Sequence, residues 1–115
     1  ARTRNIGIHL AQGEYVVILD ADDYFEPDYL ESLWGACKEN NLDIAVCDFY
    51  IRDEKSGTES MVMPSKRFTG RINRPFSRHN LPEYLLQLFN FPPYLKMYRR
   101  MFIIEYNLLF QDLLL

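Results

Sequence analysis

One short apolar run that ends in acidic residues constrains this chain more than any other feature. The run from Tyr15 to Leu19 is rich in β-branched and aromatic residues, which favours a strand covered on both faces, as in a parallel sheet. Asp20, Asp22 and Asp23 follow it directly. Because open α/β sheets bind their ligands at the carboxyl ends of strands, the run predicts an α/β fold with a site at this acidic segment.

The spacing of two of these carboxylates suits a metal ion. If the chain stays extended through Asp22, this side chain and that of Asp20 point to the same side, because side chains alternate along a strand. Mg²⁺ and Mn²⁺ prefer oxygen ligands and are usually held by one or two carboxylates plus substrate phosphates. The pair therefore favours a divalent cation that carries a phosphorylated substrate over a purely structural role at a strand end. Asp23 is expected to be structural, since Asp is common in turns.

The first half of the chain predicts two helices and a second strand. Arg2 to Gln12 favours a helix that ends at Gly13 in the left-handed conformation. Pro27 is expected in the first turn of a helix that continues to about Asn40. Ile44 to Ile51 is expected to be a strand, with a turn after it at 53–57. The apolar stripe of the second helix has helical spacing and consists of Leu30, Leu33, Trp34 and Cys37.

The second half gives weaker signals. Residues 59–80 contain one short apolar stretch and several polar breaks, which indicates a long excursion. A helix is expected around 81–89, followed by a strand at 94–98 and a short helix at 99–106.

Composition limits the class of protein. With 115 residues, of which 48% are hydrophobic, the chain can form one globular unit with a core. A net charge of −3 gives no electrostatic reason to expect nucleic acid as a partner. Cys37 and Cys47 form no metal-binding or redox motif, so free thiols are expected. No run approaches the length of a membrane helix, so a cytoplasmic location, with peripheral membrane association as a variant, is expected.

The motifs around the acidic segment resemble the inverting GT-A glycosyltransferases of family 2, which use nucleotide sugars. The resemblance implies a partial GT-A, Rossmann-like fold in which Asp20 lies near the ribose and pyrophosphate of the donor and Asp22 binds Mn²⁺ or Mg²⁺. It also makes Arg4 and Asn5 candidates for binding the substrate phosphate or sugar, against the alternative of an exposed helix face. Both side chains could also neutralise or hydrogen-bond the carboxylates. The residues that carry the resemblance are Arg4, Asn5, Gly7, Ile8, Ala11, Gly13, Glu14, Tyr15, Leu19 to Asp23, Pro27 and Leu30.

A weaker match covers Tyr94 to Phe110 and looks like the segment before the catalytic base. Two departures matter. The family's first strands, which hold the base of the nucleotide, would lie before Ala1, and the acidic pair expected after Phe110 is missing, so Asp112 is the only nearby candidate base. We therefore expect an internal fragment forming a single partial domain, with a metal and donor half at 1–58 and an acceptor-side excursion and C-terminal segment at 59–115.

The resemblance implies transfer of a sugar, with inversion, from a nucleoside diphosphate sugar such as a UDP-sugar to a saccharide or lipid-linked acceptor, as in polysaccharide biosynthesis. Two alternatives stay open. The strand ending in Asp20 and Asp22 also resembles haloacid-dehalogenase-like phosphatases, and the missing strands favour an inert scaffold or interaction module. Exposed apolar surface, including Leu113 to Leu115, predicts a homo-oligomer.

Overall fold

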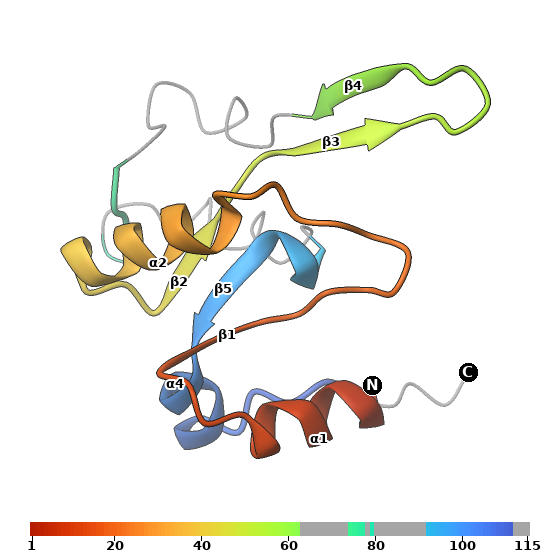
Figure 1. The fold of residues 1–115 in the computed structure, drawn as a ribbon. Helices are drawn as coiled ribbons and strands as arrows, with labels where there is room; N and C mark the ends of the chain where they lie inside the picture. Colours follow the sequence, from red (N-terminus) through yellow and green to blue (C-terminus); the bar gives the residue numbers. More distant parts are fainter. Residues whose placement is uncertain (63–73, 78, 80–91, 112–115) are drawn as a thin grey trace.

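Three short strands form the centre of the fold (Figure 1), in a computed structural model that describes residues 1–62, 74–77, 79 and 92–111. They are β1 (Tyr15–Val17), β5 (Lys96–Arg99) and β2 (Ile44–Val46), in the order β1-β5-β2. Both outer strands pair antiparallel with β5. The chain is thus a mixed α/β unit whose central strand comes from its far end.

The expected parallel sheet is wrong for the described residues, which contain only antiparallel pairs. The reason is the position of β5, which runs opposite to both β1 and β2 and separates them. The first strand also stops at Val17, and Leu19 is 50% exposed, so the run to Leu19 is not covered on both faces.

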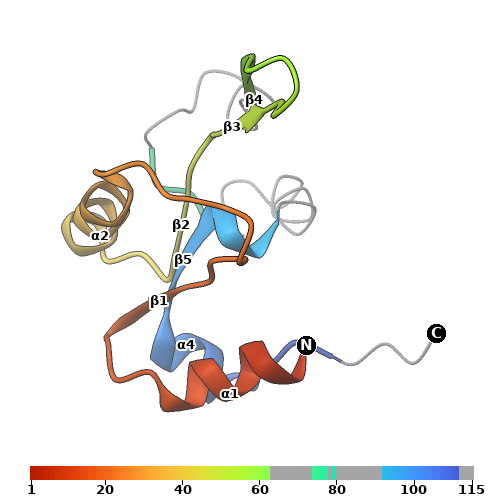
Figure 2. The same ribbon diagram turned by 45° about the vertical axis from the view of Figure 1, so that its right-hand side comes forward.

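Three helices surround this sheet in the described part of the chain. Two of them, α1 (Arg2–Leu10) and α4 (Arg100–Glu105), lie together at one end, and α2 (Tyr29–Asn40) packs beside β2. Figures 1 and 2 show the β1–α2 connection passing on the opposite side of the sheet from α2. The three predicted helical regions that fall within the described residues are therefore confirmed, with shorter bounds.

The predicted helix ends are partly wrong. The first helix ends at Leu10 because Ala11 is extended, and positive φ among the described glycines occurs at Gly57, not at Gly13. Pro27 precedes the N-cap residue Asp28, so it lies outside the first turn of α2.

The core lies between α2 and the sheet. Leu33, Cys37, Ala45 and Met97 form one buried cluster, and Cys37 has no exposed surface. The apolar stripe predicted for α2 is right at its two buried members. It is wrong at the other two, because Leu30 and Trp34 are 50% and 52% exposed.

The predicted strand 44–51 is divided into two strands that belong to different sheets. After β2, residues 47–48 leave the central sheet, and β3 (Phe49–Arg52) pairs with β4 (Glu59–Val62) to form a projecting hairpin. The predicted turn at 53–57 is confirmed: the Asp53 carboxylate accepts N–H bonds from Lys55 and Ser56. These bonds lower the pKa of the Asp53 carboxyl.

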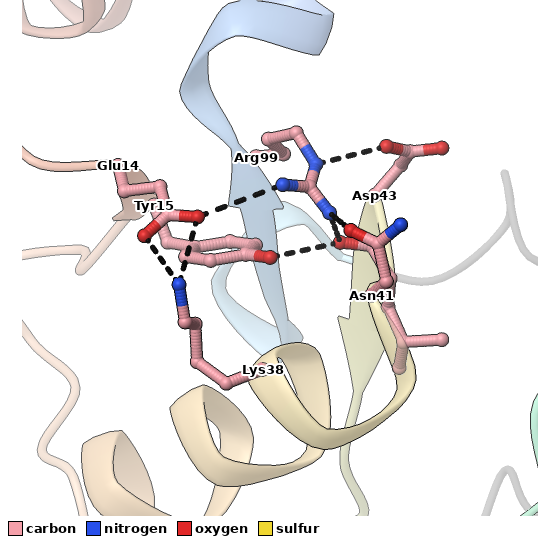
Figure 3. Close-up of polar contacts among 7 residues, drawn as sticks. Glu14, Tyr15, Lys38, Asn41, Asp43 and Arg99 are labelled. Atoms are coloured by element: carbon pink, nitrogen blue, oxygen red, sulfur yellow. Dashed lines mark hydrogen bonds and ion pairs between the residues drawn. The ribbon is translucent and has the colours of Figure 1, made fainter.

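Arg99 joins the two outer strands at one end of the sheet (Figure 3). Its Nε donates to Asp43 Oδ1 at 3.0 Å, and its Nη2 donates to the carbonyl oxygen of Leu42 at 2.9 Å and to Asn41 Oδ1 at 2.8 Å. The guanidinium carbon also lies 5.2 Å from the centre of the Tyr15 ring on β1. One half-buried cation thus connects β5 with both neighbours.

Glu14 extends this cluster to α2. Its carboxylate lies 3.6 Å from Arg99 Nη1 and accepts a bond from Lys38 Nζ at 2.9 Å. Tyr15 Oη donates to the Leu42 carbonyl at 3.2 Å, and burial raises the pKa of Tyr15. The interactions connect the start of β1, the end of α2 and the end of β5 (Figure 3).

Some expectations lie outside the described residues, namely the helix at 81–89 and the apolar end at 113–115. Large apolar side chains are nevertheless exposed within the described part, with Leu10 at 75%. Self-association through such surface remains a prediction. None of the helices in the described ranges has the length and apolar character needed to cross a membrane.

Replacing Arg99 by Met should lower the free energy of unfolding by about 1–3 kcal/mol, because partly buried partners lose a charged hydrogen-bond donor. Urea denaturation followed by far-UV circular dichroism measures this. Arg52→Met is the matched control on the exposed hairpin, and we expect a change within about 0.5 kcal/mol. Equal unfolding midpoints for the two variants would contradict this role of Arg99.

Candidate functional site

The acidic segment forms a tight reverse turn. The Asp23 N–H donates to the Asp20 carbonyl oxygen at 3.1 Å, and the chain turns at Ala21 and Asp22. The chain therefore does not stay extended through Asp22, and the expectation that strand alternation aligns its carboxylate with that of Asp20 is wrong. A turn that starts three residues after β1 interrupts the alternation.

Arg4 approaches the first carboxylate of the turn from α1. Its Nη2 lies 2.6 Å from Asp20 Oδ1, with both side chains about one-third exposed. The guanidinium carbon also lies 5.5 Å from the centre of the Phe110 ring. The structure thus confirms that Arg4 neutralises Asp20. Because both groups remain partly exposed, a ligand phosphate could also contact this guanidinium.

Asn5 makes a different contact from the one expected. Its Nδ2 donates to the carbonyl oxygen of Phe110 at 2.7 Å, and its Oδ1 accepts from the Phe110 N–H at 2.9 Å. Both functional groups of the amide are therefore occupied by the backbone near the C-terminus. The expectation that Asn5 bonds the carboxylate cluster is wrong in this structure, because the Phe110 backbone offers a matching donor and acceptor. Its proposed contact with substrate remains untested.

A cleft of about 580 Å³ lies on the other side of the acidic turn. One wall is the loop from Asp22 to Tyr29, and the other includes residues 47–52 at the start of the hairpin. Tyr94 and Leu95 also line it. Among the described residues, Asp22 and Asp23 line this cleft, whereas Arg4 and Asp20 do not.

Aromatic side chains shape this cleft. Phe25 and Tyr29 stack with ring centres 3.9 Å apart, and Tyr29 Oη donates to the Tyr94 carbonyl oxygen at 3.0 Å. Burial raises the pKa of Tyr94, and the negative charges of Asp23, Asp20 and Asp22 add to the effect in that order. The field at the Tyr94 hydroxyl is therefore negative.

The donor groups in this region fit a divalent cation only as a shared site. Asp22 is exposed on the turn and presents a carboxylate into the cleft. Within the described part of the chain, no three His, Cys, Asp or Glu residues gather closely enough to hold a metal by themselves. Carboxylate oxygen suits Mg²⁺ or Mn²⁺ when substrate phosphates complete the coordination. The residues present are compatible with that arrangement.

Sequence reasoning missed several residues of this region. Phe110 contacts both Arg4 and Asn5, and Asp48 enters the cleft because β2 ends before Cys47. An acidic residue after a strand end is a signal that could have pointed to Asp48. Asp112, the candidate base, lies outside the described residues.

Comparison with known proteins gives a consistent result. The sequence model described as "Glycosyl transferase family 2" matches residues 1–106. The chain is 35% identical over 57 residues to glycosyltransferase GlyG of Streptococcus pneumoniae, covering 50% of this chain and 19% of that protein. It is 29% identical over 109 residues to the uncharacterized glycosyltransferase EpsJ of Bacillus subtilis, covering 95% of this chain and 31% of the relative.

A further relative is named for its acceptor. The chain is 42% identical over 43 residues to the poly(ribitol-phosphate) beta-N-acetylglucosaminyltransferase TarP of Staphylococcus aureus, covering 37% of this chain and 13% of the relative. The chain spans less than one third of the length of each of these three relatives.

Replacing Asn5 by Ala should loosen the Phe110 segment. Loss of two side-chain bonds to one backbone unit should increase hydrogen exchange at the Phe110 amide by about tenfold, which corresponds to about 1.4 kcal/mol of local stability. Mass spectrometry of peptides covering 107–111 measures the change. Asn40→Ala, which removes an exposed bond within α2, is the matched control. Unchanged exchange at Phe110 would contradict the contact.

The Cys47 thiol should react slowly. Burial raises the pKa of Cys47 to about 11, and its Sγ lies 3.6 Å from the Leu95 carbonyl oxygen. Because the thiolate is the reactive form, iodoacetamide labelling at pH 8 should be about 100-fold slower than for a thiol with a pKa near 9, and should rise until the pH exceeds the pKa.

Site-resolved mass spectrometry measures the labelling, with protein unfolded in urea as the control. The free thiol of Cys37 should stay unlabelled in the folded chain because it is fully buried. Labelling of Cys47 at the same rate in folded and unfolded protein would contradict the prediction.

Proposed function

The chain belongs to glycosyl transferase family 2, and from that premise we propose that it carries part of the donor site of a metal-dependent inverting enzyme. Membership of the family supports sugar transfer in general. The single observation that supports the donor assignment is the pairing of Arg4 with Asp20 beside the exposed carboxylate of Asp22. We propose that the donor is a nucleoside diphosphate sugar, with UDP as the first nucleotide to test.

In this proposal the two carboxylates have different roles. Asp20 lies near the ribose and pyrophosphate and keeps Arg4 beside them, where its guanidinium can bind phosphate oxygens. Asp22 would hold Mn²⁺ or Mg²⁺. When bound, such an ion stabilises the negative charge that the leaving diphosphate gains. Asn5 supports the site by holding the backbone at Phe110, and its contact with the substrate is a further part of the proposal.

Inversion requires a direct displacement at the anomeric carbon. The acceptor oxygen forms a bond to this carbon on the face opposite the diphosphate, the bond to the diphosphate oxygen breaks, and a carboxylate takes the proton of the acceptor hydroxyl. Asp112 is the candidate for that carboxylate within this sequence. The acceptor would be a saccharide or a lipid-linked saccharide, and the acceptor in the name of TarP is not transferred to this chain.

Calorimetric titration of UDP into the chain with and without Mn²⁺ tests this proposal. We expect saturable binding that depends on the metal and weakens at least about tenfold in Asp22→Asn, because one charged ligand of the cation is lost. Asp23→Asn is the matched control, since its N–H rather than its carboxylate makes the turn bond.

The results separate the alternatives. Metal-dependent binding that is equal in Asp22→Asn and the original chain would overturn the assignment of Asp22. Absence of UDP binding with folded protein would contradict an assembled donor site in this chain and favour the inert scaffold.

A further inference from the structure

We propose that the cleft between the acidic turn and the β3–β4 hairpin receives the acceptor sugar and selects acceptors whose entering residues carry no phosphate or carboxylate group. The inference rests on the proposed glycosyl transfer and adds the chemical class of the acceptor. It depends on the surface of the cleft, its charge and its separation from Arg4.

The surface of the cleft suits a sugar ring. Tyr24 on the acidic loop and Tyr50 on β3 are 61% and 50% exposed, and both line the cleft from different walls. An exposed tyrosine offers an apolar ring face with a polar hydroxyl at its edge. Pyranose rings have the same combination of an apolar C–H face and a polar rim. The volume of about 580 Å³ also lies within the range common for small-molecule sites.

The charge of the cleft determines which sugars fit. The charged side chains in its lining are Asp22, Asp23, Glu26, Asp48, Glu54 and Arg52, which are five carboxylates and one guanidinium. A divalent cation at Asp22 would reduce this excess of negative charge without reversing it. An acceptor with phosphate or uronic acid groups would therefore be repelled, whereas hydroxyl and ammonium groups can donate hydrogen bonds to the carboxylates.

The environment of Tyr94 agrees with this charge distribution. Its pKa is raised by burial and then by three carboxylates of the acidic turn, so their charge acts inside the cleft. Arg4 does not line the cleft and instead pairs with Asp20. The turn thus separates a side that offers a cation to phosphate from a side that offers carboxylates to sugar hydroxyls.

Three β-1,4-linked tetrasaccharides test the inference. Cellotetraose is neutral, its glucuronic acid counterpart differs by carboxylates at C6, and the chitosan tetramer differs by ammonium groups at C2. Titration of each into the isotope-labelled chain, followed by NMR, gives its Kd and shows whether the signals of Tyr24 and Tyr50 shift.

We expect the glucuronic acid tetramer to bind at least about tenfold more weakly than cellotetraose at low salt, and the chitosan tetramer at least about threefold more tightly, with both differences shrinking in concentrated salt. Asp48→Asn combined with Glu54→Gln should reduce the penalty on the glucuronic acid tetramer at least about threefold, because both carboxylates line the cleft. Glu39→Gln on α2 is the control outside the cleft and should leave it unchanged.

Equal or tighter binding of the glucuronic acid tetramer would overturn the inference. So would a series in which none of the tetramers shifts Tyr24 or Tyr50, or an equal effect of Glu39→Gln and the cleft variant. The UDP titration with Mn²⁺ on the same sample separates the two proposals, since metal-dependent UDP binding with failed acceptor selection overturns the acceptor class alone.

Discussion

The fold depends on the insertion of β5 between β1 and β2. This strand brings residues 96–99 from the far end of the chain to the centre of the sheet, where it pairs with both neighbours. Backbone bonds close the same end from both sides, because the Arg99 N–H donates to the Asp43 carbonyl and the Arg100 N–H donates to the Glu14 carbonyl. The side chain of Arg99 then connects both outer strands, so β1 and the acidic turn that follows it are held in place by a distant segment.

Arg100 extends this connection to α1. Its guanidinium donates to the carbonyl oxygens of Ile8 and His9 in the last turn of that helix, at 3.1 and 3.2 Å. Such carbonyls lack partners within the helix, so a cation there satisfies them and also suits the helix dipole. Because α1 carries Arg4, the end of β5 helps to place the cation that reaches Asp20. Consecutive arginines therefore connect the sheet on one side and the candidate donor site on the other.

Local features of the structure could be predicted from the sequence, and long-range contacts could not. The start of β1, the body of α2 and the turn at 53–57 follow from short patterns of apolar, capping and turn residues. The antiparallel position of β5 depends on pairing across about half the chain or more, which no local pattern encodes. The clamp between Asn5 and Phe110 joins residues 105 positions apart, and the exposure of Trp34 depends on what packs against α2.

The reverse turn at Asp20 to Asp23 gives the region its chemical asymmetry. An extended chain would direct Asp20 and Asp22 to one side. The turn instead allows Asp20 to pair with Arg4 while Asp22 lines the cleft. A transferase that joins an anionic donor to an uncharged acceptor needs such a boundary, because the same field cannot attract both the diphosphate and the hydroxyl-rich partner equally well. Placing the cation-binding carboxylate at the boundary would let one ion offset the charge of the donor without making the acceptor cleft positive.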